Sequence, residues 1–330
     1  MSEVPTPALP RSDQAAALTL LARDIKLAHS VFALPFALFG ACYAVARSDS
    51  ATSGTQLLTP RFAGQVALII ACMVLARTWA MLVNRLADRA IDAKNARTQR
   101  RALASGAVVA KTGWSVAIAC AAGFVACCSL FLIFFKNPLP LALCVPVLLW
   151  IGAYSYTKRF TWLCHAWLGI SLAASPICAA VALNPASLHT PTLWLLAAFI
   201  ACWVAGFDII YALQDQDFDR SQKLHSIPAA FGWRGALWIS RVLHVVSICA
   251  LVVMWRLDPV FGTLLLVGII AAAALLAYEH LTLAKLEASA IKPREDGSDN
   301  PPPALNMIFF TLNGVLSCVL GACAISDLFL

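Results

Sequence analysis

Residues 193–219 read LWLLAAFIACWVAGFDIIYALQDQDFD, an apolar run that ends in a group of acidic residues. The apolar part has about the length of roughly 20 residues that an α-helix needs to cross the hydrocarbon core of a bilayer. Asp208 follows this run directly, and an ionised carboxylate at that depth is costly unless it is paired or bound to a metal. The stretch therefore predicts a membrane-spanning helix that ends in a polar site.

The rest of the chain has the same apolar character. Of its 330 residues, 61% are hydrophobic and 12% are charged, whereas soluble domains usually carry roughly 25% charged residues. A membrane β-barrel is a poor alternative, because its strands read as short alternating segments and not as long apolar runs. We therefore expect an all-α membrane protein.

Apolar runs separated by charged or Pro/Gly-rich breaks predict about nine transmembrane helices. Their bounds are 28–46, 62–84, 113–135, 139–157, 161–183, 193–213, 235–255, 259–280 and 304–325. Loops that combine acids, bases and amides follow the second and the sixth run, and this spacing predicts two four-helix repeats plus one helix. We expect a single transmembrane domain over residues 15–330, preceded by a disordered tail at 1–14.

The distribution of lysine and arginine indicates an orientation. If the N-terminus is cytoplasmic, the external connections carry only Arg47, Arg61, Lys136 and Arg256. Because basic residues accumulate on the cytoplasmic side, we expect a cytoplasmic N-terminus and a site on the cytoplasmic face of the membrane. In a bacterium, this would be the inner membrane. The net charge of +7 has this topological explanation, so we expect the lipid bilayer and no nucleic acid as a partner.

The second apolar run continues into the sequence NRLADRAID at residues 84–92. On one α-helix, positions i, i+4 and i+8 drift by only about 40° per step, so Asn84, Asp88 and Asp92 would share one face. Such oxygen ligands suit Mg²⁺, which proteins hold with carboxylates, waters and substrate phosphates. The alternative is a solvated helix end whose acids pair with neighbouring basic residues, and the spacing alone leaves both open.

The sixth apolar run carries a second acidic group. On one helix, Asp208, Asp215 and Asp219 would share a face, while Asp217 would point to the opposite side. A single buried aspartate could be a proton-relay residue, but aligned acids in two loops favour two magnesium sites that face each other.

Taken together, the two motifs resemble those of the UbiA-type family of membrane prenyltransferases, N-D-x-x-D-x-x-x-D and D-x-x-x-x-x-x-D-x-x-x-D. Further similar segments are KLAHSVFALPFA at 26–37, YSYTKRFT at 154–161 and LHSIP at 224–228. The resemblance covers most of the chain and is strongest to the bacterial 4-hydroxybenzoate polyprenyltransferase-like branch. The chain departs from the pattern at Arg85, where many members have an acid, at Ala96 and Ala104, where proline is frequent, and at Lys223, where glycine is usual.

The resemblance implies Mg²⁺-dependent transfer of a polyprenyl group from polyprenyl diphosphate to an aromatic acid. It implies catalytic and metal-binding roles for Asn84, Asp88, Asp92, Asp208, Asp215 and Asp219. It also implies substrate binding by Arg97, Lys158, Arg159, Tyr154 and Tyr211, because basic side chains grip diphosphate or carboxylate and tyrosine rings stabilise a cation. His29 and His225 match as well, either as structural histidines or as proton acceptors.

The acceptor and the class of function have alternatives. The resemblance favours 4-hydroxybenzoate in ubiquinone biosynthesis, and a naphthoate-type precursor in menaquinone biosynthesis is the alternative. An ion-coupled transporter would use the same acids for a coupling ion, and it would need acids accessible from both sides of the membrane. A CDP-alcohol phosphotransferase is disfavoured, because its D-G-x-x-A-R motif is absent from the sequence.

Overall fold

The computed structural model describes residues 11–25, 32–47, 57, 59–286, 305 and 307–330. These residues form helices and contain no strand, which confirms the predicted all-α class. In chain order the elements are α1 (Arg11–Ile25), α2 (Leu34–Ala46), α3 (Pro60–Ala87), α4 (Arg89–Asp92), α5 (Ala110–Phe135), α6 (Leu139–Thr157), α7 (Cys164–Leu183), η3 (Pro185–His189), α8 (Pro191–Ala212), η4 (Leu213–Asp215), α9 (Gln216–Ser221), α10 (Ile227–Leu257), α11 (Thr263–Lys285), η6 (Met307–Leu312) and α13 (Asn313–Asp327).

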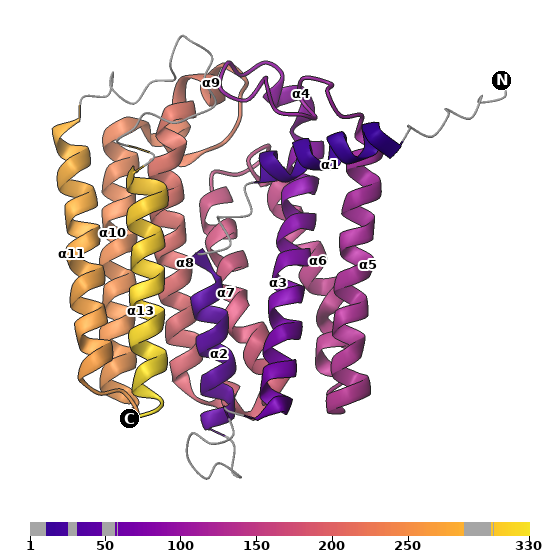
Figure 1. The fold of residues 1–330 in the computed structure, drawn as a ribbon. Coiled ribbons are helices and arrows are strands. Elements are labelled where there is room, and N and C mark those ends of the chain that lie inside the picture. Colours follow the sequence, from indigo (N-terminus) through magenta and orange to yellow (C-terminus); the bar gives the residue numbers. More distant parts are fainter. Residues whose placement is uncertain (1–10, 26–31, 48–56, 58, 287–304, 306) are drawn as a thin grey trace.

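Within the described part of the chain, 8 helices are long and apolar enough to cross a membrane. They stand side by side in one bundle (Figure 1), as expected for a multi-pass membrane protein. The predicted span 28–46 lies partly outside the described residues, and its described part forms α2, which has 13 residues. That helix is shorter than the roughly 20 residues of a full crossing, so the count of nine stays a prediction.

Helix α10 begins earlier than the predicted span at 235–255. The Ser226 side chain caps it by accepting a hydrogen bond from the backbone N–H of Ala229 at 3.3 Å, and Pro228 lies in its first turn. Both are residue types that favour helix starts. The helix is interrupted at Gly232, whose φ of 70° is accessible to glycine without strain. The loop that precedes α10 is therefore short.

Helix α1 lies across one end of the bundle (Figure 1). Its buried residues Ala17, Leu21 and Ile25 pack in one apolar cluster with α3 and with residues of the loop after α4. The helix begins at Arg11, so the last four residues of the tail predicted at 1–14 lie within α1. The alanines and leucines that follow them are strong helix formers. Residues 1–10 lie outside the described part.

Helix α8 is the most buried of the spanning helices and packs against both α7 and α10. Its Phe199 and Trp203 rings stack at 5.6 Å between centroids, and Phe36 of α2 meets both edge-on. Gly169 of α7 lies so close to the carbonyl of Ala201 that no Cβ would fit between them, and small residues generally permit such helix contacts in membranes. This packing fixes the helix that carries Asp208.

Candidate active site

The two acidic segments lie at the same end of the bundle, where α4 and α9 are found (Figure 1). Successive spanning helices alternate in direction, so α3 and α8 both end there. The first segment continues from α3 into α4, and the second continues from α8 through η4 into α9. We refer to residues 84–92 and 208–219, together with the loops beside them, as the acidic end.

Neither acidic motif lies on one continuous helix, so this part of the prediction is wrong. Helix α3 ends at Ala87 and is followed by Asp88, where φ is −90° and ψ is 4°, and η4 ends at Asp215, where φ is −101° and ψ is 6°. The short side chain of aspartate competes with the helix backbone and favours helix ends. The first motif nevertheless keeps the backbone hydrogen bonds between residues i and i+4. The Asp88 N–H donates to the Asn84 carbonyl at 2.9 Å, and the Asp92 N–H donates to the Asp88 carbonyl at 2.7 Å.

Asp88 is 4% exposed and is surrounded by the two basic residues that follow α6. Arg159 donates to its Oδ1 at 3.2 Å, and the Nζ of Lys158 lies 3.9 Å from its Oδ2. Asn84 also donates to Oδ2 at 3.3 Å, while the Asn84 oxygen accepts from Arg85 at 2.9 Å. Burial is the strongest influence on Asp88 and raises its pKa above the usual range despite both cations.

Asp215 joins the second acidic segment to the loop of the first. Arg97 donates to both of its oxygens, from Nε to Oδ1 at 3.0 Å and from Nη2 to Oδ2 at 2.5 Å, and Asn95 donates to Oδ1 at 3.1 Å. Burial alone would lower the pKa of Arg97, but the Asp215 carboxylate outweighs it and holds that pKa above its ordinary value. Arg97 also lies over the ring of Tyr211, 5.6 Å from the centroid. A bidentate pair of this kind fixes geometry as well as charge.

Of the remaining acids, Asp92 and Asp219 are buried and Asp208 is half-buried. Asp92 is paired with Arg101 at 2.9 Å. Asp219 is 5% exposed, is hydrogen-bonded by Ser226, and contrasts with the exposed Asp217, as the sequence predicted for these two faces. The Oδ2 atom of Asp208 lies 2.7 Å from Nδ1 of His165.

Lys158 lies between the two acidic segments. Besides Asp88, its ammonium group attracts Asp215 and Asp219. Tyr154, one turn earlier on α6, is within electrostatic range of both Asp88 and Asp208. Sequence positions from α3, α6 and α8 are thus brought together at this end of the bundle.

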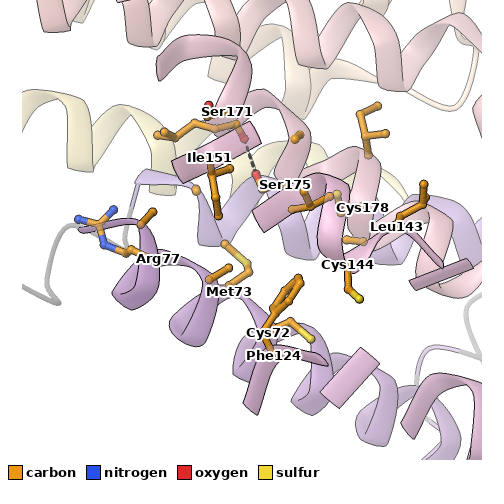
Figure 2. A pocket seen from close by; sticks show the side chains of 18 of the residues that line it. Cys72, Met73, Arg77, Phe124, Leu143, Cys144, Ile151, Ser171, Ser175 and Cys178 are labelled. Atoms are coloured by element: carbon orange, nitrogen blue, oxygen red, sulfur yellow. Dashed lines mark hydrogen bonds between the residues drawn. The ribbon is translucent and has the colours of Figure 1, made fainter. Parts of the chain in front are cut away.

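An apolar cavity of about 300 Å³ extends from this site along α3, α5, α6 and α7. Asn84 and Tyr154 line it near the acidic end, and Phe131, Pro140 and Val181 line it near the other end of the same helices. Arg77 is its one basic lining residue, and within the described chain its buried Nε has no hydrogen-bond partner. Figure 2 shows Arg77 at one edge of the labelled lining side chains, with its guanidinium group directed away from them in this view.

The donors of the acidic end suit magnesium in their chemistry. They are carboxylate and amide oxygens, the hard ligands that Mg²⁺ prefers. Among the residues that the structure places, no three or more His, Cys, Asp or Glu side chains are arranged to hold a metal ion. Asp88, Asp92 and Asp215 are instead neutralised by arginine or lysine. The chemistry of the donor set therefore fits a magnesium ion, while in this structure these three carboxylates are engaged in ion pairs.

Sequence reasoning missed three residues of the site. Arg77 could have been found, because an arginine inside an apolar run is a functional candidate by itself. His165 also lies within an apolar run, but nothing in the sequence connects it to Asp208. The amide of Asn95 is placed only by the fold. Of the two histidines that had been considered, His225 is exposed and His29 lies outside the described residues.

Comparisons with known proteins agree on one family. The sequence matches the UbiA prenyltransferase family over residues 33–294. It is 29% identical over 208 residues to a 4-hydroxybenzoate octaprenyltransferase of Vibrio cholerae, a match that covers 62% of this chain and 69% of that protein. It is 36% identical over 146 residues to the protein of the same name from Nitrosomonas europaea, covering 44% and 48%.

The fold is similar to solved structures of the same family. A UbiA homolog from Aeropyrum pernix K1 has a TM-score of 0.70 and 29% identity, with 91% of this chain and 98% of that one covered. A UbiA homolog from Archaeoglobus fulgidus bound to GPP and Mg²⁺ has a TM-score of 0.62 and 17% identity, covering 94% and 100%. The family match spans well over half of the sequence, and it confirms the resemblance seen in the motifs. The chain belongs to the UbiA prenyltransferase family.

Proposed function

We propose that this protein transfers a polyprenyl group from polyprenyl diphosphate to an aromatic carboxylic acid, with 4-hydroxybenzoate as the acceptor. The observation that carries the proposal is the meeting of both acidic segments around Lys158, directly beside an apolar cavity lined by Asn84 and Tyr154. Support also comes from the relatives named 4-hydroxybenzoate octaprenyltransferase and from the similar fold solved with GPP and Mg²⁺.

The proposal includes a membrane arrangement. The protein crosses the bacterial inner membrane nine times, as two four-helix repeats plus one helix, with a cytoplasmic N-terminus. The acidic end then faces the cytoplasm, where water-soluble diphosphate can leave. The location of both acidic segments at one end favours an enzyme over an ion-coupled transporter, which needs acids accessible from both sides.

The acidic and the basic residues have different roles in binding the prenyl diphosphate. Asp88, Asp92, Asp208, Asp215 and Asp219, with Asn84, would hold Mg²⁺, which supplies charge neutralisation that helps diphosphate to leave. Lys158 and Arg159 are close to these acids and bind the diphosphate oxygens. Arg97 does the same once its pairing with Asp215 is exchanged.

The bond between the first prenyl carbon and the diphosphate oxygen breaks, and the ring carbon next to the phenol hydroxyl forms the new carbon–carbon bond. That ring carbon then gives its proton to the released diphosphate. The allylic carbon carries positive charge during this step. Tyr154, which lines the cavity, and Tyr211, which already lies under the Arg97 guanidinium, stabilise that charge with their ring faces.

The cavity suits the apolar and the aromatic parts of the substrates. Its lining is mostly aliphatic and aromatic side chains contributed by α3, α5, α6 and α7, which matches a chain of isoprene units. Arg77 is a cation within this apolar wall, and a buried cation gains most from an anionic partner. We assign it to the carboxylate of the aromatic acid, and this role distinguishes a carboxylate acceptor from a neutral phenol or a naphthoquinol.

Activity of the purified protein in lipid nanodiscs tests the proposal. Polyprenyl diphosphate, 4-hydroxybenzoate and Mg²⁺ should yield 3-polyprenyl-4-hydroxybenzoate and diphosphate, detected by mass spectrometry. EDTA should abolish the reaction. Product formation in EDTA, or no product with 4-hydroxybenzoate but product with 1,4-dihydroxy-2-naphthoate, would contradict the mechanism or the acceptor respectively.

Arg77→Met tests the acceptor site. A charge-assisted hydrogen bond contributes roughly 1.5–3 kcal/mol, so the KM for 4-hydroxybenzoate should rise about 10- to 100-fold while the KM for the diphosphate stays the same. Met73→Leu is the matched control, because Met73 lines the same cavity one turn earlier on α3. An equal rise of KM in both variants would reject a specific role for Arg77.

A further inference from the structure

Asp208 differs from three of the other acids in being hydrogen-bonded by a histidine and not by an arginine. Asp88, Asp92 and Asp215 are each bonded by arginine, whereas Oδ2 of Asp208 is 2.7 Å from Nδ1 of His165. The other oxygen of Asp208 has no hydrogen bond to any residue that the structure describes. One oxygen is thus fixed and the other is available.

The His165 ring is held from both sides. It is 3% exposed, and its Nε2 accepts the backbone N–H of Ile227 at 3.3 Å. Because Nε2 acts as an acceptor there, the ring proton is on Nδ1, which therefore donates to Asp208. The two hydrogen bonds leave the ring no freedom to rotate, so they set the orientation of the Asp208 carboxylate.

The segment that fixes His165 also leads to Lys158. The backbone N–H of His225 donates to the carbonyl of Lys158 at 2.7 Å, and the thiol of Cys164 donates to the carbonyl of His225 at 3.6 Å. The turn between α6 and α7 and the start of α10 are thereby held together next to Asp208. A displacement of His165 would move both a carboxylate and the cation-bearing turn.

We infer that His165 is a positioning residue that holds Asp208 with its Oδ1 directed to a divalent cation. Histidine and carboxylate commonly form such an arrangement around metals, in which a hydrogen bond fixes the orientation of a ligand. The inference rests on the proposed function in one respect, the assignment of Asp208 as a metal ligand. It adds a residue that lies 43 positions from Asp208 in the sequence and does not itself contact a substrate.

Metal binding provides a readout that is independent of turnover. Mn²⁺ would be titrated by electron paramagnetic resonance into the full-length protein in nanodiscs, in the presence of inorganic pyrophosphate. His165→Leu should weaken Mn²⁺ binding about 10- to 100-fold, the usual effect of losing a hydrogen bond to a metal ligand. His165→Asn should restore binding to near the wild-type value, because its amide N–H can replace the Nδ1 donor.

His244→Leu is the matched control. His244 is also 3% exposed, but its ring contacts the Trp203 carbonyl and His280 and no acid of the site. It should lower the melting temperature as much as His165→Leu does while leaving Mn²⁺ affinity unchanged. Equal loss of affinity in the two leucine variants, or no rescue by asparagine, would overturn the positioning role.

Asp208→Asn separates this inference from the proposed function. If Asp208→Asn weakens Mn²⁺ binding and His165→Leu does not, the positioning role fails and the proposed function is retained. If Asp208→Asn leaves Mn²⁺ affinity unchanged, the metal assignment itself fails. In kinetic measurements, the wild-type and the His165→Asn proteins should share the same KM for Mg²⁺, with a higher value in His165→Leu.

Discussion

Asp88 at the acidic end and Asp258 at the opposite end are buried to nearly the same degree, with 4% and 3% exposure. Each directly follows the last residue of a spanning helix, α3 or α10. Their surroundings differ. Asp258 accepts from Thr192 and Tyr43 at 2.6 Å each and from Arg47 at 3.1 Å.

The pKa values of the two carboxyl groups shift in opposite directions. Burial raises the pKa of Asp258, but the hydrogen bonds from Thr192 and Tyr43 outweigh it, and the pKa falls below its ordinary value. At Asp88 the contacts are longer, 3.2 Å to Arg159 and 3.9 Å to Lys158, and burial prevails. A carboxylate that its own protein leaves insufficiently stabilised gains most from an added cation. The comparison therefore separates a structural aspartate from one suited to bind a ligand.

The largest expected effect is the loss of activity in Asp88→Asn. Removing a carboxylate that we propose to bind the metal should lower kcat/KM at least about 100-fold, while Asp258→Asn should retain most of the activity. Stability should show the reverse order, because Asp258→Asn disrupts a satisfied buried network at a cost of about 1–3 kcal/mol. Prenyl transfer assays measure the activity of both variants, and thermal melts measure their stability. A similar loss of activity in both would contradict the distinction between a ligand-binding Asp88 and a structural Asp258.

The two ion pairs should also differ. Arg97 is buried and bonds Asp215 twice, so Arg97→Leu leaves a buried carboxylate without its partner, at a cost of about 3 kcal/mol or more. The Arg47 side chain is 40% exposed, and Asp258 keeps its hydroxyl donors without it, so Arg47→Leu should cost about 1 kcal/mol or less. Chemical unfolding in detergent measures both, and equal values would show that burial is not the deciding factor.

The pH dependence of stability should distinguish the same two aspartates. The folded-state pKa of Asp88 lies above the unfolded value near 3.8, so its contribution to stability is present below that value and is lost as the pH rises through the folded pKa. Asp88→Asn should therefore melt higher than wild type at pH 7, with no gain below pH 3.8. Asp258 has a lowered folded pKa, so its contribution is present above the unfolded value and is lost as the pH falls through the folded pKa.

Asp258→Asn should accordingly melt below wild type at pH 7 and approach it in acid. Differential scanning fluorimetry of the three proteins from neutral to acidic pH provides the measurement. A lower melting temperature for Asp88→Asn at pH 7 would mean that its ion pairs with Lys158 and Arg159 outweigh its burial.

The sequence predicts the helices well because hydrophobic length determines a membrane span, and the acids are recognisable because charges are rare in such a chain. It does not predict which partner each acid takes. Arg97 bonds an aspartate 118 positions away, and the bond depends on how the fold brings the loop after α4 next to η4. The assumption of straight helices also failed at Asp88 and Asp215, where the motif residue itself ends the helix.

One departure from the family pattern does become understandable from the backbone. Lys223, where relatives usually have glycine, has a φ of 54°, a left-handed conformation that glycine adopts freely. From the sequence alone, this lysine could either contact a phosphate or be a surface charge. Its side chain is exposed, which favours the second of these interpretations.

The smallest expected effect compares Lys223 at the acidic end with Lys136 at the opposite end, the two residues other than glycine with positive φ in the part of the chain that the structure describes. A left-handed conformation costs such a residue roughly 1–2 kcal/mol. Glycine avoids this cost but loses more backbone entropy on folding, which offsets part of the gain. Lys223→Gly and Lys136→Gly should each raise stability by roughly 0.5–1 kcal/mol, seen as a small rise in melting temperature. Neither should change activity. If Lys223→Gly alone raises the KM for the prenyl diphosphate, then Lys223 contacts the diphosphate and belongs to the site, and only Lys136 is purely structural.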